Sequence, residues 1–136
     1  MKPIPDGYTR IASNIYYEDP VAVMDWLCEA FGFEIRLKIQ SPDGELQHSE
    51  LVYGDGMIMV GDAAKVREFK SPRSVDGVNT QTLHVYVDDV DEHCKQARAA
   101  GAKIHIEPGD RDYGNRVYLA EDIQGHRWWF SEPMNA

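Results

Sequence analysis

The sequence predicts an α+β fold made of two paired β-α-β-β-β modules, which form a curved mixed sheet around a cleft. The first observation is a repeat, because residues 10–35 and residues 82–104 follow the same order about seventy residues apart. Each copy reads as a strand that ends in an acidic residue, an amphipathic helix that closes at Gly32 or Gly101, and another strand. The second observation is that two such modules need each other to close a core, so we expect a ligand at their seam.

The length bounds the organisation of the chain. With 136 residues we expect a single domain over residues 1–136, which is long enough for one sizeable core but too short for two independent ones. Within it we expect a first module over residues 8–62, a linker over residues 63–81 and a second module over residues 82–132. The linker is predicted because this stretch is polar and carries both charge signs, a proline and a glycine.

The first module begins with a strand over residues 11–17, in which apolar side chains alternate. Asp19 and Pro20 then suit a helix start, with the aspartate as N-cap and the proline at the first helical position. Gly32 suits the helix stop. Three further strands are expected at residues 34–39, 46–53 and 57–60, with turns at residues 41–44 and 55–56.

The second module repeats this order. Its first strand is expected over residues 82–87, and its helix over residues 90–100. Three strands follow, at residues 103–106, 116–121 and 126–131.

The leading strand of each module has two unlike faces. In the second module, Leu83, Val85 and Val87 form an aliphatic face suited to packing on the following helix. The opposite faces of the two leading strands carry small, polar or aromatic residues: Ala12, Asn14, Tyr16, Thr82, His84 and Tyr86. A sheet face of this kind is either exposed to solvent or covered by a bound molecule. We therefore expect the two sides to face each other and to enclose the cleft in which a ligand binds.

Charge and composition exclude several function classes. The formal net charge of −9 disfavours nucleic acids and anionic membranes as partners, because both would be repelled. No apolar run approaches the length needed to cross a bilayer, and the first residues lack the apolar core of a signal peptide. We therefore expect a cytoplasmic globular protein with 43% hydrophobic residues and no membrane partner.

Four segments carry a family resemblance. The helices read D-P-V-A-V-M-D-W-L-C-E-A-F-G-F over residues 19–33 and V-D-D-V-D-E-H-C-K-Q-A-R-A-A-G-A over residues 87–102. With the paired strand order, they resemble the vicinal oxygen chelate superfamily of glyoxalase I, extradiol dioxygenases and bleomycin-resistance proteins. The endings Y-G-N-R and D-I-Q-G-H-R-W resemble its PhnB-like branch, with Ile123 in place of the usual proline. The resemblance implies the glyoxalase/bleomycin-resistance fold and leaves the activity open.

Enzymes of this superfamily bind a divalent metal through His, Gln and Glu side chains from the first and last strands of each module. The resemblance places these positions here at Ala12, at Met59 or Val60 depending on the register, at Thr82 and at Trp129. None of these residues offers an imidazole or a carboxylate, and a thioether or a hydroxyl does not replace them for a hard or borderline dication. We therefore expect no metal and no cofactor.

Other residues leave a relocated metal site open. His84 lies two residues beyond a vacated position, and His48 and Glu50 can share one face of their strand. Two histidines and a carboxylate can bind zinc or iron. The alternative for His48 and Glu50 is that both are exposed at a sheet edge, and His93 is expected to be solvated on a polar helix face.

The remaining cleft residues resemble the lining of the drug-sequestering branch. Aromatic walls and a pliable methionine suit flat or cationic ligands. The expected ligand-binding residues are Asn14, Tyr16, Met59, His84, Tyr86, Arg116 and Trp129. Two alternatives remain open: the aromatic side chains pack on each other in a filled core, and Arg116 forms a salt bridge instead of holding an anionic group of a ligand.

The leading functional hypothesis is that a homodimer binds an antibiotic or an aromatic metabolite without a metal. The protein would then give resistance by sequestering this molecule, without enzymatic activity. One alternative is a metal-dependent lyase, isomerase or dioxygenase with relocated ligands. Another is a metal-free enzyme with His84 as general base, because this is the only histidine expected in the cleft.

Overall fold

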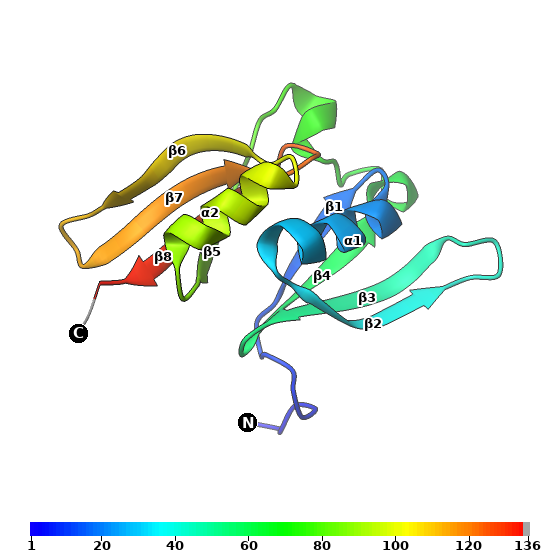
Figure 1. Ribbon diagram of the computed structural model, residues 1–136. Coiled ribbons are helices and arrows are strands. Elements are labelled where there is room, and N and C mark those ends of the chain that lie inside the picture. The colour runs from blue at the N-terminus through cyan, green and yellow to red at the C-terminus, as the bar shows by residue number, and fades with distance from the viewer. Residues whose placement is uncertain (135–136) are drawn as a thin grey trace. The chain divides into compact units, whose positions relative to one another are not determined.

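The computed structural model describes residues 1–134 as two compact units (Figure 1). The first unit holds residues 1–28 and 32–70, and the second holds residues 29–31 and the described residues from 71 to 134. The elements of the first unit are β1 (Ser13–Tyr17), α1 (Pro20–Phe31), β2 (Glu34–Gln40), β3 (Leu46–Tyr53), β4 (Gly56–Asp62) and the short 3-10 helix η1 (Ala63–Lys65). Those of the second unit are η2 (Pro72–Val75), β5 (Leu83–Tyr86), α2 (Val90–Ala99), β6 (Lys103–Asp110), β7 (Asn115–Glu121) and β8 (Arg127–Pro133).

Both units have the same sheet topology. The strand orders are β1-β4-β3-β2 and β5-β8-β7-β6. The leading strand of each unit pairs in parallel with the last strand, and the remaining neighbours are antiparallel. The prediction of an α+β fold from two β-α-β-β-β modules is confirmed.

Several strands begin or end at other residues than predicted, because their ends are set by pairing with the neighbouring strand and not by the hydrophobic pattern of the sequence. The strand expected from Ile11 begins at Ser13, which is the first residue in register with β4. Strand β4, expected to end at residue 60, continues to Asp62, because it pairs with β1 up to Tyr17. Similarly, β6 extends to Asp110 through irregular pairing with β7.

The two helices begin in different ways, although an aspartate precedes both. The side chain of Asp19 makes no capping hydrogen bond, so Pro20 at the first helical position is the start signal of α1. The side chain of Asp89 accepts a hydrogen bond from the backbone N–H of Glu92 and caps α2. The first helix ends as predicted at Gly32, whose φ of 86° is the left-handed conformation that glycine adopts without strain.

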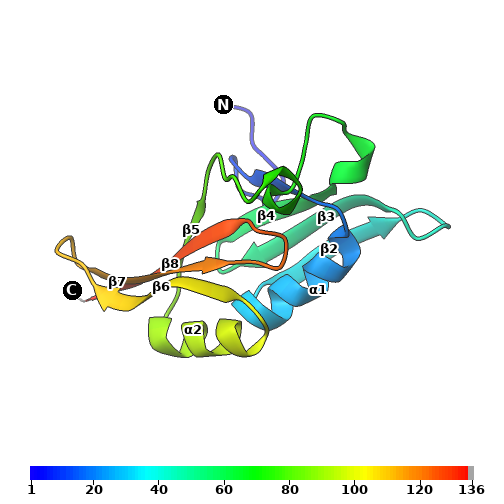
Figure 2. The ribbon, with the colours of Figure 1, turned by 90° about the horizontal axis from the view of Figure 1, so that it is seen from above.

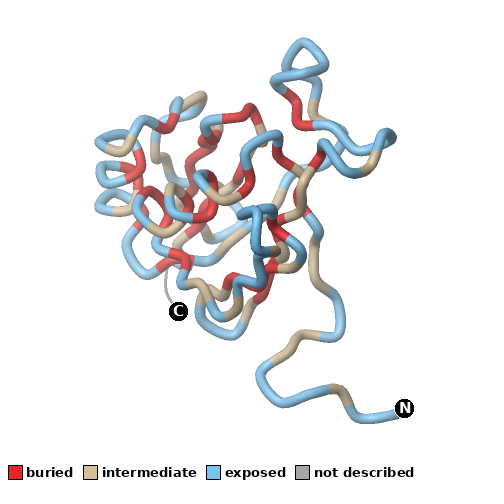
Figure 3. Tube along the Cα trace, turned by 90° about the vertical axis from the view of Figure 1, so that its right-hand side faces the viewer, coloured by how far each residue is buried: buried red, intermediate tan, exposed pale blue. Residues whose placement is uncertain are grey.

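Burial follows the alternation of the strands. In β1, Ile15 and Tyr17 are buried, whereas Asn14 is exposed and Tyr16, between the two buried residues, is half-buried. The first ten residues lie mostly at the surface (Figure 3), and the buried stretches fall on strands and helices. Within residues 1–134, no helix is long and apolar enough to span a bilayer.

Aromatic rings form the centre of the second unit. Trp128 and Phe130 on β8 stack with ring centroids 6.2 Å apart, and both contact the ring of Phe31. The indole N–H of Trp128 donates to the buried carboxylate of Asp122, 3.1 Å away. Helix α2 covers this side of its sheet (Figure 2), so we call the opposite side the distal face of the second sheet.

Candidate functional site

The distal face of the second sheet carries three of the predicted ligand-binding residues. His84 is in register with Trp129, and Tyr86 is in register with Ser131, so these four side chains share one face of the β5–β8 pair. His84 is exposed and Trp129 is half-buried. Tyr86 has 57% of its surface exposed, and its hydroxyl accepts a hydrogen bond from Nδ2 of Asn115 on β7 over 3.3 Å.

His84 has a fixed orientation. Its Nε2 shares a hydrogen bond with the Oγ of Ser131 over 2.8 Å. Its ring also meets the ring of Tyr86 edge-on, with centroids 4.7 Å apart. Ser131 was missed by the sequence reasoning, because the pairing of β5 with β8 brings together residues 47 positions apart.

The matching face of the first sheet has the same layout. Asn14 is in register with Met59, and Tyr16 is in register with Gly61. The pair Asn14–Met59 of the first sheet therefore corresponds to the pair His84–Trp129 of the second. Likewise Tyr16 corresponds to Tyr86, so in both units a tyrosine lies on the strand that precedes the helix.

Tyr16 is held differently from Tyr86. Its ring lies over Gly61, where an added Cβ would come within 2.7 Å of the tyrosine Cε1. It also meets the ring of Phe69, with centroids 4.3 Å apart. This tyrosine is therefore half-buried in packing contacts within its own unit.

The positions that hold a metal in enzymes of this fold do not fit a metal here. Ala12 and Thr82 directly precede β1 and β5, and Met59 and Trp129 lie on β4 and β8. An alanine and an indole offer no ligand atom, and a thioether and a hydroxyl are poor ligands for a hard or borderline dication. Among residues 1–134 there is also no group of three or more His, Cys, Asp or Glu side chains arranged to hold an ion.

Glu50 is buried, and the expectation of an exposed residue at a sheet edge is wrong for it. The side chain is 2% exposed. Its Oε2 accepts a hydrogen bond from the hydroxyl of Tyr8 (2.5 Å) and lies 3.0 Å from Nε2 of His48, while Nε of Arg36 lies 3.6 Å from its Oε1. The hydrogen bonds from Tyr8 and His48 lower the pKa of the Glu50 carboxyl, and the charge of Arg36 adds to this. The carboxylate stays ionised and fastens the N-terminal segment to the sheet.

His93 is not solvated, contrary to the expectation from the polar helix face. Its Nδ1 lies 2.5 Å from the hydroxyl of Tyr118, and its Nε2 lies 2.7 Å from the backbone oxygen of Phe31. Burial lowers the pKa of His93. The neutral ring is therefore favoured, with Nε2–H donating to the carbonyl and Nδ1 accepting from Tyr118.

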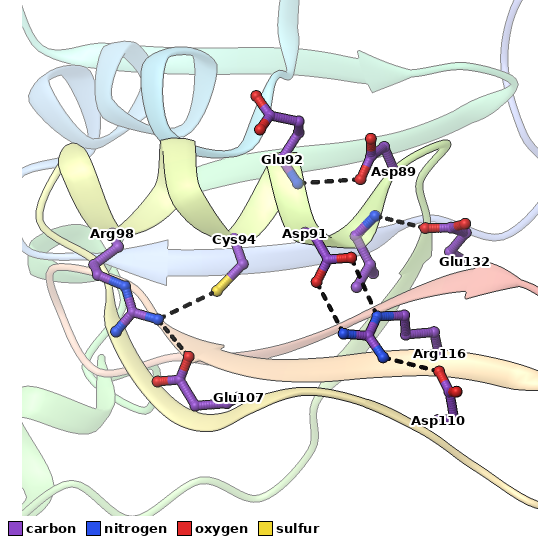
Figure 4. A network of polar contacts seen from close by, with 10 residues as sticks. Asp89, Asp91, Glu92, Cys94, Arg98, Glu107, Asp110, Arg116 and Glu132 are labelled. Carbon is purple, nitrogen blue, oxygen red and sulfur yellow. Dashed lines mark hydrogen bonds and ion pairs between the residues drawn. The ribbon is translucent and has the colours of Figure 1, made fainter.

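Arg116 lies apart from His84 and Trp129. Its guanidinium reaches toward α2 and pairs with Asp91 at 3.0 Å and with Asp110 at 2.9 Å (Figure 4). These hydrogen bonds raise the pKa of Arg116 above its ordinary value. Of the two roles open for this residue, the structure contains the salt bridge.

Known proteins share this architecture. TioX from Micromonospora sp. ML1, for which a crystal structure exists, is 32% identical in sequence to this chain. The two structures match with a TM-score of 0.71 over 90% of this chain and 97% of that one. TnmS3, described as an antibiotic binding protein from Streptomyces sp. CB03234, has the same fold with a TM-score of 0.69 at 16% identity, over 92% of this chain and 96% of that one.

Sequence comparison agrees with the structures. An uncharacterized protein of Mycobacterium bovis is 28% identical over 127 residues, which cover 91% of this chain and 83% of that protein. The family description Glyoxalase/Bleomycin resistance protein/Dioxygenase superfamily matches residues 8–130. The predicted family resemblance is thus confirmed, while the PhnB-like branch stays a prediction. This chain belongs to the glyoxalase/bleomycin resistance protein/dioxygenase superfamily.

Proposed function

We propose that the protein binds a small, partly aromatic organic molecule, such as an antibiotic or an aromatic metabolite, without a metal, and that it acts by sequestration. One observation carries this proposal. The register pairs Asn14–Met59 and His84–Trp129 occupy the same place in the two sheets, and they present a thioether and an indole where the enzymes of the family present metal ligands.

The chemistry of the distal face supports binding of a flat ligand. A half-buried indole offers a large, rigid contact surface, and it prefers offset stacking on another ring. The exposed ring of Tyr86 and the fixed ring of His84 lie on the same face. In the first sheet, Met59 can adjust its shape to different ligands.

The relative TnmS3 supports the same proposal from outside the chain. It is described as an antibiotic binding protein and has this fold. At 16% identity the likeness extends to the fold alone. TnmS3 is therefore an example of antibiotic binding by a protein with this fold. The rest of the support for the proposal comes from the residues of this chain.

The test is ligand binding by chelator-treated protein. We expect members of a panel of aromatic antibiotics to raise the melting temperature, because a ligand selective for the folded state stabilises it. Trp129→Ala should weaken binding of the hits by at least about tenfold, since losing a stacked aromatic contact removes a large part of the contact energy. The control Tyr113→Ala removes an aromatic ring that is exposed in the turn between β6 and β7, and should leave binding unchanged.

Two results would contradict the proposal. One is stoichiometric zinc, nickel, manganese or iron in the purified protein together with metal-dependent turnover, which would favour a lyase, isomerase or dioxygenase. The other is chemical conversion of a bound ligand, detected by mass spectrometry of the molecule released from the protein. The predicted homodimer is checked in the same preparations by light scattering after size-exclusion chromatography.

A further inference from the structure

Strand β8 presents a cation beside the indole on the distal face. Arg127 and Trp129 are separated by one residue, so their side chains leave the same side of the strand about 7 Å apart. Glu121 of β7 is in register with Arg127, and Leu119 is in register with Trp129. The face therefore places a guanidinium next to an aromatic surface with an apolar neighbour.

Both β8 side chains have hydrogen-bond donors that the protein does not use. The ion pair of Arg127 is long, because its Nε lies 3.8 Å from Oε1 of Glu121. This Nε is shielded from solvent and has no hydrogen-bond partner within residues 1–134, although the side chain as a whole is 39% exposed. The indole N–H of Trp129 likewise has no partner in that part of the chain, whereas the indole N–H of Trp128 donates to Asp122.

Two acceptor atoms on the same face are already engaged. Nε2 of His105 donates to Oε1 of Glu121 over 2.7 Å. The Oγ of Ser131 is paired with His84. A ligand can reach only the exposed part of the Arg127 side chain, because its Nε is shielded from solvent. A guanidinium favours a ligand that brings acceptor atoms, and it binds carboxylates in particular through two parallel hydrogen bonds.

We infer that Arg127 and Trp129 together select an acidic aromatic ligand, with the ring system stacked on the indole and a carboxylate bound to the guanidinium. This inference rests on the proposed function and specifies the class of ligand. Arg116 does not serve this purpose, because two aspartates already hold its guanidinium. A cationic aromatic ligand is disfavoured, because it would approach Arg127 and find Glu121 already bonded to His105.

Three probes of one shape test the inference: 1-naphthoate, 1-naphthamide and 1-naphthylmethylammonium, titrated into the full chain near neutral pH by calorimetry. We expect the acid to bind about tenfold more tightly than the amide, and the ammonium most weakly. Arg127→Gln should remove the preference for the acid and leave amide binding unchanged. Arg127→Lys, which keeps the charge but lacks the planar fork, should retain part of the preference.

Arg67→Gln is the matched control, because it makes the same charge change at an exposed residue of the first unit. The melting temperature of each variant shows whether it is folded. If the three probes bind alike and Arg127→Gln changes nothing, or if the ammonium binds best, the inference is refuted while the proposed ligand binding stands. If neither these probes nor the antibiotic panel binds, the proposed function fails and the inference fails with it.

Discussion

Replacing Glu50 by glutamine measures what the buried carboxylate contributes to the first unit. Hydrogen bonds to a charged group contribute about 1.5–3 kcal/mol each, against about 0.5–1.5 kcal/mol between neutral groups. Glutamine keeps the shape, so each of the hydrogen bonds to Tyr8 and His48 should lose roughly 1 kcal/mol. The contact with Arg36 adds less, because that side chain is one-third exposed to solvent. We expect the free energy of unfolding to fall by about 2 kcal/mol.

Urea denaturation at neutral pH, followed by circular dichroism, measures this loss. The control is Glu45→Gln, which removes a carboxylate that is 57% exposed and pairs with Lys65 over 3.2 Å. A surface ion pair of this kind contributes less than about 1 kcal/mol, so the control should remain close to the wild type. If Glu50→Gln costs no more than Glu45→Gln, the buried carboxylate does not stabilise the fold as argued.

Acidification provides an independent check on Glu50. Because its pKa is lowered in the folded protein, its contribution is present above the unfolded pKa of about 4.3 and is lost as the pH falls through the folded pKa. The stability difference between the wild type and Glu50→Gln should therefore shrink below about pH 4. A difference that persists unchanged at low pH would point to a steric effect of the glutamine.

Three further predictions concern packing. Because burial lowers the pKa of His93, thermal stability should fall as the pH is lowered from about 7.5 to 5.5, by up to about 1.4 kcal/mol per pH unit, and His93→Gln should lose this part of the slope in calorimetric melts. Gly61→Ala should displace the ring of Tyr16 and cost about 1–3 kcal/mol in urea denaturation, and an unchanged midpoint would show that the ring yields freely. Trp128→Phe should cost about 1–3 kcal/mol, because it removes the indole hydrogen bond to the buried carboxylate of Asp122; a change within about 0.5 kcal/mol would contradict this.

Local signals predicted the elements that depend on neighbouring residues. Pro20 and Gly32 bound α1, because the ring of a proline and the left-handed conformation of a glycine act on the chain where they stand. Strand β3 runs from Leu46 to Tyr53 as predicted, between two tight turns with their own glycines. The alternation in β1 also identified which side chains are buried.

The hydrogen-bond partners of the buried polar side chains could not be predicted from the sequence, because these contacts join segments that are far apart along the chain. Tyr8 and Glu50 are 42 residues apart, and a glutamate within a strand gives no local sign that a distant tyrosine will bond it. His93 belongs to a polar helix pattern, yet it bonds the backbone of Phe31, 62 residues earlier. For the unused donor of Arg127 the sequence signal is equally weak, since it depends on the register of β7 with β8.

The two matching tyrosines, Tyr16 and Tyr86, have different residues in register with them on the neighbouring strand. Gly61 has no side chain, so the phenol ring of the first unit can recline on the backbone beneath it. At the matching place the second unit has Ser131, whose hydroxyl bonds His84, and the hydroxyl of Tyr86 accepts a hydrogen bond from Asn115 of β7 while its ring remains exposed. The duplicated scaffold thus carries one tyrosine packed against its own sheet and one that is exposed, so its two halves differ in the aromatic surface that they offer to a ligand.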